Sequence, residues 1–233
     1  MDGLYATNFL LFTAMGINSS SRKEAVVSAA IDRAFRDASS HVLSIDGGNE
    51  PKKELGKAVI SKALEELESI DDYAKWHDDL CQQLLDKEYS PAKEHPQKSI
   101  TYGIAQKWVN MTMKYLAVAY YVLNEHEACE EYCSFYEWAV KRHEASLHVP
   151  VDRFIIEAAW RKSPDIKLPV DDPSRRAKQY KHPADHCTAW SKWSKDDYKQ
   201  FQETLRDSLS QHPLDWEGSA WIENADRNSS QDC

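Results

Sequence analysis

The sequence predicts an all-α fold, and three observations support this prediction. The chain of 233 residues contains only 7 glycines and 9 prolines, which disfavours architectures built on frequent tight turns. Hydrophobic residues make up 42% of the chain, as in globular proteins. Apolar side chains recur at spacings of three and four residues, the period of an amphipathic helix. We expect one domain over residues 1–223 and a flexible polar tail over 224–233.

Three helices are expected in the first hundred residues. Apolar stripes over residues 25–34 and 59–67 predict the first two, and a turn signal at residues 45–52, with the sequence Asp-Gly-Gly-Asn-Glu-Pro, separates them. A third helix, acidic on one side, is predicted from about residue 71 to residue 87. It ends before Ser90 and Pro91, because a residue that precedes proline disfavours the helical conformation.

The second half of the chain begins with its most apolar segment. A core helix is predicted from about Gly103, and a second helix follows over residues 127–144. The sequence His-Val-Pro-Val at 148–151 predicts an extended approach to a third helix over 152–162. After a proline-rich irregular stretch, helix returns at 196–210, and Pro213 opens a short terminal element.

Charge and cysteine content bound the function. The net charge of −9 argues, as an average, against a dedicated nucleic-acid binder. The five cysteines are irregularly spaced, which predicts neither a disulfide framework nor an iron–sulfur arrangement and favours a reducing cytoplasm. The longest apolar stretch, Leu4 to Ile17, is shorter than a membrane span and lacks a basic leader. We therefore expect a soluble, cytoplasmic, monomeric protein without a cofactor.

The charge is nevertheless unevenly distributed. Residues 153–199 contain 11 basic and 7 acidic side chains, and residues 173–195 contain six basic and one acidic. Basic groups neutralise phosphates and aromatic rings stack on unpaired bases, so this mixture predicts a nucleic-acid-binding groove. The candidate residues in this stretch are Arg175, Arg176, Lys178, Lys181, Trp190 and Trp193. The alternative is a solvated loop whose tryptophans pack on the core.

A metal site is not expected in the same stretch. His182, His186 and Cys187 are close in sequence, but Pro183 disturbs the helical geometry that would bring the two imidazoles together. No third and fourth ligands are suitably spaced nearby. Surface or phosphate-contacting histidines are therefore the default interpretation.

One lysine and one aspartate are the strongest catalytic candidates. Lys107 follows Gly103 by about one turn, near the start of the apolar helix, where desolvation and the helix dipole disfavour its protonated form. A neutral amine so placed can act as a nucleophile. Asp152 follows Val-Pro-Val and is predicted to cap the next helix, where backbone N–H groups fix its carboxylate. Taken singly, each residue also has a purely structural explanation. The Lys107 side chain can simply extend past its apolar neighbours, and Asp152 can serve only as a helix cap.

Together, the two segments resemble the helix-hairpin-helix base-excision DNA glycosylases of the 8-oxoguanine type. In that family a Gly-x-x-x-Lys start of a hydrophobic helix is followed by a Val-Pro-Val-Asp entry to another helix, and the pair Gln106-Lys107 is most similar to the archaeal 8-oxoguanine glycosylases. The resemblance implies a two-lobed helical fold with the catalytic pair between the lobes. It also implies double-stranded DNA as the partner, with the target nucleotide flipped out of the stack.

The resemblance implies a role for each residue. Lys107 matches the lysine that attacks C1′ of the flipped nucleotide, or positions its sugar, and Asp152 matches the carboxylate that stabilises the developing positive charge. The chain departs from the family in having a single glycine, so that its hairpin is degenerate, and in the 45-residue step from Lys107 to Asp152. The resemblance covers residues 102–161.

The remaining predictions concern the substrate and its contacts. Candidates for the base pocket are Gln106, Trp108 and His148, and further DNA-binding candidates are Gly103, Lys114, Arg153 and Arg161. The excised base is either an oxidised purine or a hypermodified cytosine, such as the glucosylated hydroxymethylcytosine of phage DNA. An oxidised purine would indicate a role in DNA repair, and a hypermodified cytosine a role in antiviral defence. A possible associated lyase activity stays open. The alternatives are a non-catalytic helical module whose acidic face, residues 71–88, binds a basic partner, and an RNA-binding protein.

Overall fold

The prediction of an all-α fold is confirmed. The computed structural model describes residues 3–39, 50–86, 100–163, 165–169 and 187–231, and within these ranges it contains helices and no β-strand. None of the helices in these ranges combines the length and the apolar character needed to cross a bilayer. The helices are α1 (Gly3–Met15), α2 (Lys23–Ser39), α3 (Glu50–Glu66), α4 (Tyr73–Asp86), α5 (Tyr102–Asn124), α6 (Glu130–Phe135), α7 (Arg153–Lys162), α8 (Lys195–Asp207) and α9 (Pro213–Gln231).

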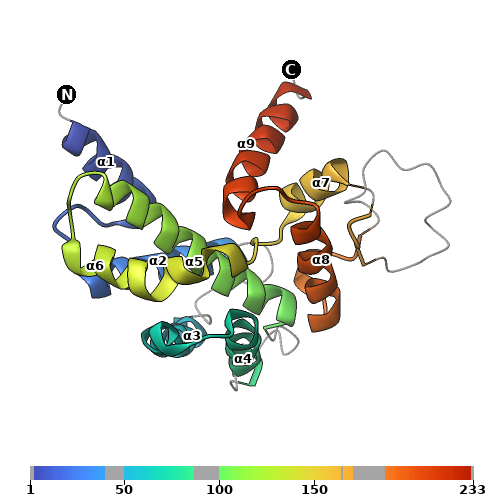
Figure 1. The fold of residues 1–233 in the computed structure, drawn as a ribbon, viewed down its shortest axis with the longest axis horizontal. Helices are drawn as coiled ribbons and strands as arrows, with labels where there is room; N and C mark the ends of the chain where they lie inside the picture. The colour runs from blue at the N-terminus through green and yellow to red at the C-terminus, as the bar shows by residue number, and fades with distance from the viewer. Residues whose placement is uncertain (1–2, 40–49, 87–99, 164, 170–186, 232–233) are drawn as a thin grey trace.

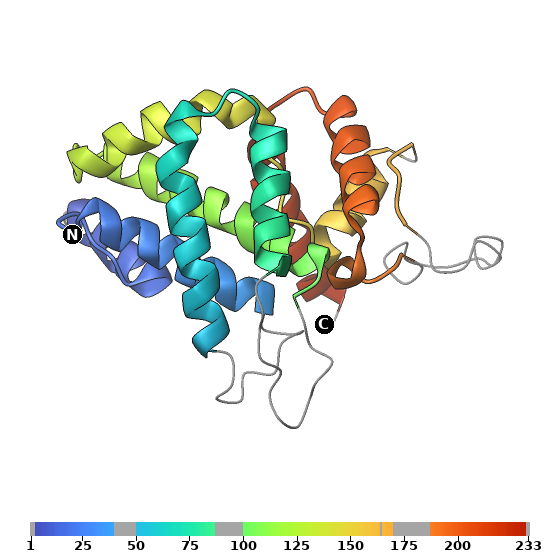
Figure 2. The same cartoon turned by 90° about the horizontal axis from the view of Figure 1, so that it is seen from below.

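Helix α5 is the central element of the fold. It packs most extensively against α2 and also contacts α4, while α7 packs against α9 (Figure 1). In Figure 2, α3 and α4 lie side by side, with α4 packed against α5 and α3 against α2. The indole of Trp108 on α5 is fully buried, and its Nε1 donates a hydrogen bond of 3.1 Å to the carbonyl oxygen of Ile31. Its ring lies 4.7 Å from that of Phe35, so the α2–α5 contact forms much of the core.

Several helix boundaries differ from those predicted. Helix α3 begins at Glu50, inside the turn predicted at 45–52, because proline is tolerated in the first turn of a helix. The helix predicted over 127–144 starts only at Glu130, since Glu127 and Cys129 have φ values of 50° and 53°. It then continues as a π-helical turn, η2 (Tyr136–Val140), and a 3₁₀ segment, η3 (Lys141–Ser146).

The C-terminal element is longer than expected. Helix α9 continues to Gln231, so residues 224–231 are helical rather than a frayed tail. Pro213 occupies the first helical position, where its missing N–H has no intrahelical partner to lose. The extended helix carries Glu217 and Trp221 along α7, which gives this element a part in the site described below.

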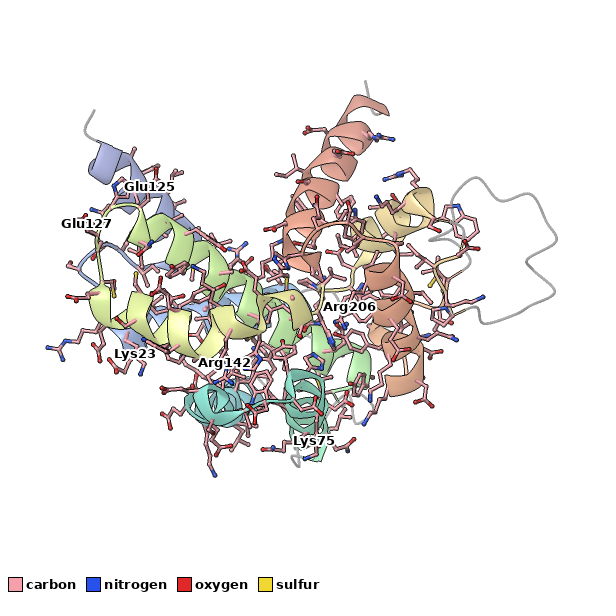
Figure 3. All side chains as sticks on the ribbon, in the orientation of Figure 1. Lys23, Lys75, Glu125, Glu127, Arg142 and Arg206 are labelled. Carbon is pink, nitrogen blue, oxygen red and sulfur yellow. The ribbon has the colours of Figure 1, made fainter. Side chains whose placement is uncertain are left out.

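The extended segment at 148–151 forms as predicted, and it is buried. Leu147, Val149 and Val151 are completely excluded from solvent. The segment leads from η3 to α7 through the middle of the molecule (Figure 1). Arg206 of α8, labelled in Figure 3, donates a hydrogen bond to the carbonyl oxygen of Ser146 at the start of this passage. These contacts fix the path of the chain into Asp152.

Candidate active site

Lys107 and Asp152 lie together, although 45 residues separate them in the sequence. Lys107 Nζ is 3.5 Å from Asp152 Oδ2, and the two side chains are 9% and 19% exposed. Both groups line one pocket between α2 and α5 on one side and α7 and α9 on the other. The pair therefore forms a largely desolvated amine–carboxylate contact at a point that a ligand can reach from the pocket.

Asp152 caps helix α7, as the sequence predicts. Its backbone is extended, with φ of −143° and ψ of −176°, and its Oδ1 accepts a 2.9 Å hydrogen bond from the backbone N–H of Ile155. The cap uses Oδ1, so Oδ2 is the atom directed toward Lys107. The helix start thus fixes the carboxylate and leaves one of its oxygens available for chemistry.

Lys107 lies in the second turn of α5, with a tryptophan above it. Its Nζ is 4.5 Å from the centre of the Trp190 ring, a cation–π geometry. A carboxylate and an aromatic face are both neighbours that stabilise an ammonium group. For the amine to act as a nucleophile its proton must first leave, and the Asp152 carboxylate is within 3.5 Å to receive it.

The position of Trp190 depends on the start of α5. Trp190 belongs to the 3₁₀ turn η6 (Trp190–Lys192), which packs against α5. Thr101, the N-cap of α5, donates its hydroxyl proton to the carbonyl oxygen of Ser191. A Cβ atom at Gly103 would overlap the carbonyl oxygen of Trp190. Gly103 is therefore required for the close approach of η6, and it is covered by protein rather than open to a DNA phosphate, which corrects its prediction as a DNA contact.

Replacing Gly103 with alanine is expected to destabilise the protein. Alanine favours a helix by up to about 1 kcal/mol over glycine, but the overlap with backbone atoms of η6 is expected to exceed this gain, with a net cost of about 1–3 kcal/mol. Gly218 in α9 is the matched control, since a Cβ there has no neighbour within 4 Å and Gly218→Ala should stabilise. Urea unfolding measures both, and equal stabilisation by the two substitutions would contradict the close approach of η6.

The pocket around the pair has a volume of about 560 Å³. Its walls combine aromatic rings with groups of both charges, contributed by α2, α5, the start of α7, η6 and α9. The lining residues are Arg33, Asp37, Lys107, Met111, Lys114, Tyr115, Asp152, Arg153, Phe154, Trp190, Glu217 and Trp221. The rings of Phe154 and Trp221 meet edge to face with their centres 5.5 Å apart. Such a pocket suits a flat, polar ring held between aromatic faces.

A second lysine–carboxylate pair lies in the same pocket. Lys114 Nζ contacts both carboxylate oxygens of Glu217, at 2.8 Å and 2.7 Å. Glu217 is 1% exposed, and burial raises the pKa of its carboxyl group, an effect that Lys114 opposes. Lys114 was predicted to contact DNA. The structure places it in the pocket, where its ammonium group is already paired with a carboxylate.

The α2 wall of the pocket presents a fixed arginine. Arg33 Nε lies 3.3 Å from the Tyr115 hydroxyl and 3.5 Å from Asp37 Oδ2, and the Tyr115 hydroxyl donates to the same Asp37 oxygen. Burial and the bond to Asp37 raise the pKa of Tyr115 to about 12, so it stays a neutral donor. These contacts hold the guanidinium opposite the Asp152 side of the pocket.

The structure does not bring the three base-pocket candidates into the pocket. Gln106 is fully buried and donates to the carbonyl oxygen of Gly103, and Trp108 belongs to the α2–α5 core. His148 is buried against Tyr198, whose hydroxyl lies 2.8 Å from its Nδ1, and burial lowers the pKa of His148 well below its usual value. Gln106 and Trp108 point away from the Lys107 face of α5, because neighbours in sequence lie on different faces of a helix.

The DNA-binding candidates are scattered. Trp193 is 1% exposed and packs edge to face on Phe201, so it belongs to the core, as the alternative interpretation of that stretch holds. Arg153 is exposed at the pocket, where its Nε is 3.0 Å from Glu157. Arg161 is exposed and lines a separate hollow between α7 and α9. The candidates Arg175, Arg176, Lys178 and Lys181, with His182 and His186, lie outside the described residues.

Several pocket residues were missed by the sequence analysis. Glu217 and Trp221 are four residues apart on one face of α9, a spacing that is visible in the sequence but does not by itself indicate a site. Arg33 and Tyr115 fall within predicted helices, where no local signal indicates a role for either. Only the packing of α2 and α9 around α5 and α7 shows that these side chains share one pocket.

Over the part of the chain that the structure describes, no group of three or more His, Cys, Asp or Glu side chains is arranged to hold a metal ion. Comparison of the chain with known proteins found no match to a family model, a curated protein or a solved structure.

Proposed function

We propose that this protein is a DNA glycosylase that excises a modified base from a flipped-out nucleotide. The observation that carries the proposal is the 3.5 Å contact between Lys107 Nζ and Asp152 Oδ2, in a pocket with aromatic walls. It agrees with the pairing of lysine and aspartate that the resemblance to the 8-oxoguanine type of glycosylase implies. The substrate is either an oxidised purine or a hypermodified cytosine.

The chemistry follows from the two side chains. The Asp152 carboxylate takes a proton from the Lys107 ammonium group, and the neutral amine then attacks C1′ of the nucleotide. As the new C1′–N bond forms, the glycosidic bond breaks and its electron pair leaves with the base, which takes the proton back from the Asp152 carboxyl group. Opening of the sugar ring gives a Schiff base, which water hydrolyses to an abasic site. Once it has returned the proton, the Asp152 carboxylate is again negatively charged and stabilises the positive charge that remains on the sugar.

The pocket walls support a nucleobase as the ligand. Aromatic rings from three elements, Trp190, Phe154 and Trp221, stand around the reactive pair, and such rings stack on bases without regard to their sequence. Arg153 lies exposed beside them and can approach a phosphate at the pocket entrance. A base in a duplex cannot reach this pocket, so flipping is part of the proposal.

Borohydride trapping tests the proposal. The protein is incubated with duplexes containing oxidised, deaminated, alkylated or glucosylated-hydroxymethyl bases, and base release is read as alkali-sensitive sites. We expect one class of base to be released and sodium borohydride to convert the Schiff base to a stable protein–DNA adduct. Lys107→Gln should remove the adduct completely, because it lacks the amine that forms the bond.

Lys114→Gln is the matched control, since it removes a second lysine from the same helix and pocket. Its adduct should persist. Base release by Lys107→Gln at the rate of the unsubstituted protein would contradict the role of Lys107 as nucleophile. Binding of single-stranded RNA or a basic protein without release of any base would instead favour one of the two non-catalytic alternatives.

A further inference from the structure

The backbone N–H and carbonyl groups of Val149 are both hydrogen-bonded to one side chain, as they would be to a neighbouring strand in a β-sheet. Gln202 of α8 accepts a 3.1 Å hydrogen bond from the Val149 N–H through Oε1 and donates a 2.8 Å bond to the Val149 carbonyl oxygen through Nε2. Val149 is fully buried and Gln202 is 4% exposed. The side-chain amide of Gln202 therefore satisfies both backbone polar groups of Val149, at a buried position where water cannot take its place.

A second amide ties the same peptide to the helix of Lys107. Asn110 of α5 is fully buried, and its Nδ2 lies 3.3 Å from the Val149 carbonyl oxygen. Asn110 follows Lys107 by three residues, and Val149 precedes Asp152 by three residues. The contact between Asn110 and Val149 therefore joins the backbones that carry the two reactive side chains.

Asn110 is itself held in one orientation by its other neighbours. Its Nδ2 is 3.0 Å from Gln106 Oε1 and 2.7 Å from the Tyr198 hydroxyl, and its Oδ1 is 3.0 Å from His77 Nε2. Because Nδ2 donates, Oδ1 must accept, so His77 carries its proton on Nε2. The network extends over α4, α5 and α8, and it leaves the Asn110 amide a single orientation in which it can bind the Val149 carbonyl.

We propose that Gln202 and Asn110 are positioning residues that set the separation of Lys107 and Asp152 by holding the Val149 peptide. Neither residue lines the pocket, so each acts through the backbone that leads into Asp152. The catalytic consequence of this role rests on the proposed function, whereas the geometric consequence does not. Pro150 and Val151 are buried between the held peptide and the cap, which leaves little freedom for the carboxylate to return to its place once the peptide is released.

The test uses Gln202→Met, which keeps the length of the side chain but removes both hydrogen bonds to Val149. In a crystal structure of this variant, we expect the distance from Lys107 Nζ to Asp152 Oδ2 to lengthen beyond the roughly 4 Å of an ion pair. The maximal single-turnover rate of base excision should fall by about 100-fold, as expected for misplacement of about 1 Å. The dissociation constant for DNA should stay unchanged, because the substitution removes no side chain that lines the pocket.

Thr112→Val is the matched control. Thr112 is also fully buried on α5, and its hydroxyl donates to the carbonyl oxygen of Trp108 in its own helix, away from Val149. Thr112→Val should leave both the Lys107–Asp152 distance and the single-turnover rate unchanged. If Gln202→Met does not fold, Gln202→Glu, which keeps the acceptor for the Val149 N–H, provides the same measurement with one hydrogen bond lost.

An unchanged Lys107–Asp152 distance in the Gln202 variant overturns the positioning role, whatever the protein catalyses. A loss of DNA affinity equal to the loss of rate also overturns it, since a general structural defect weakens both. If the unsubstituted protein releases no base from any duplex, the proposed function fails, while the distance in the crystal still decides the positioning role.

Discussion

Asp152→Asn is expected to lower the rate of base excision by about 100-fold or more while leaving the protein folded. Asparagine caps a helix as well as aspartate does, and its Oδ1 can keep the bond to the Ile155 N–H. The amide carries no charge and cannot accept a proton from Lys107, so both the activation of the amine and the stabilisation of the sugar cation are lost. Single-turnover kinetics, with the protein in saturating excess over the DNA duplex, give the rate of base excision. Urea unfolding gives the stability.

Asp152→Ala separates the two roles of this residue. It removes the cap as well as the charge, and a lost cap costs about 0.5–2 kcal/mol of stability. We expect Asp152→Ala and Asp152→Asn to be equally slow, but only the alanine variant to be less stable. If asparagine supports excision at the rate of the unsubstituted protein, Asp152 is a helix cap alone and the proposed mechanism is wrong.

The sequence predicts both members of the reactive pair, Lys107 and Asp152, because each follows a local signal in the sequence. Gly103 lies in the first turn of the apolar helix that contains Lys107, and Val-Pro-Val precedes the cap at Asp152. Caps and helix starts depend on residues within one turn, so they can be predicted from neighbours in the sequence. That the two segments meet was expected from the resemblance, and the structure places their side chains in contact.

The walls of the pocket lack such local signals. Trp190 lies over Lys107 because its backbone packs on Gly103, a contact between residues that are far apart in sequence. Trp108 and Trp193 have the same residue type in similar stretches, yet both are buried in the core. An aromatic residue beside a catalytic motif serves a core as well as a pocket, and tertiary packing alone decides between the two.

The buried polar residues show the same limit. His148 was predicted at the base pocket because it adjoins the Val-Pro-Val-Asp motif, but it is buried against Tyr198 and His77. Four residues of an extended chain span about 13 Å, at roughly 3.3 Å per residue, so proximity in sequence to Asp152 does not place a side chain near it. The histidines instead belong to the network that surrounds Asn110.

This network predicts a loss of stability in acid. Burial lowers the pKa of His77 to about 4, an effect that Asp78 and the bond to Asn110 oppose, whereas a histidine in the unfolded chain titrates near 6.5. Because the folded state binds the proton more weakly, the stabilisation is complete above pH 6.5 and is lost as the pH falls toward 4. Between pH 7.5 and pH 4.5, His77 should account for about 2–3 kcal/mol of the lost free energy of unfolding.

His77→Gln measures this contribution. Glutamine can donate to Asn110 Oδ1 in place of the histidine Nε2, but it does not titrate. The variant should therefore lose about 2–3 kcal/mol less than the unsubstituted protein when urea unfolding is compared at pH 7.5 and pH 4.5. His212→Gln is the control for the loss of a histidine, because His212 lies at the surface before α9. If the unsubstituted protein and His77→Gln lose the same free energy of unfolding between pH 7.5 and pH 4.5, His77 does not need to be neutral in the folded protein.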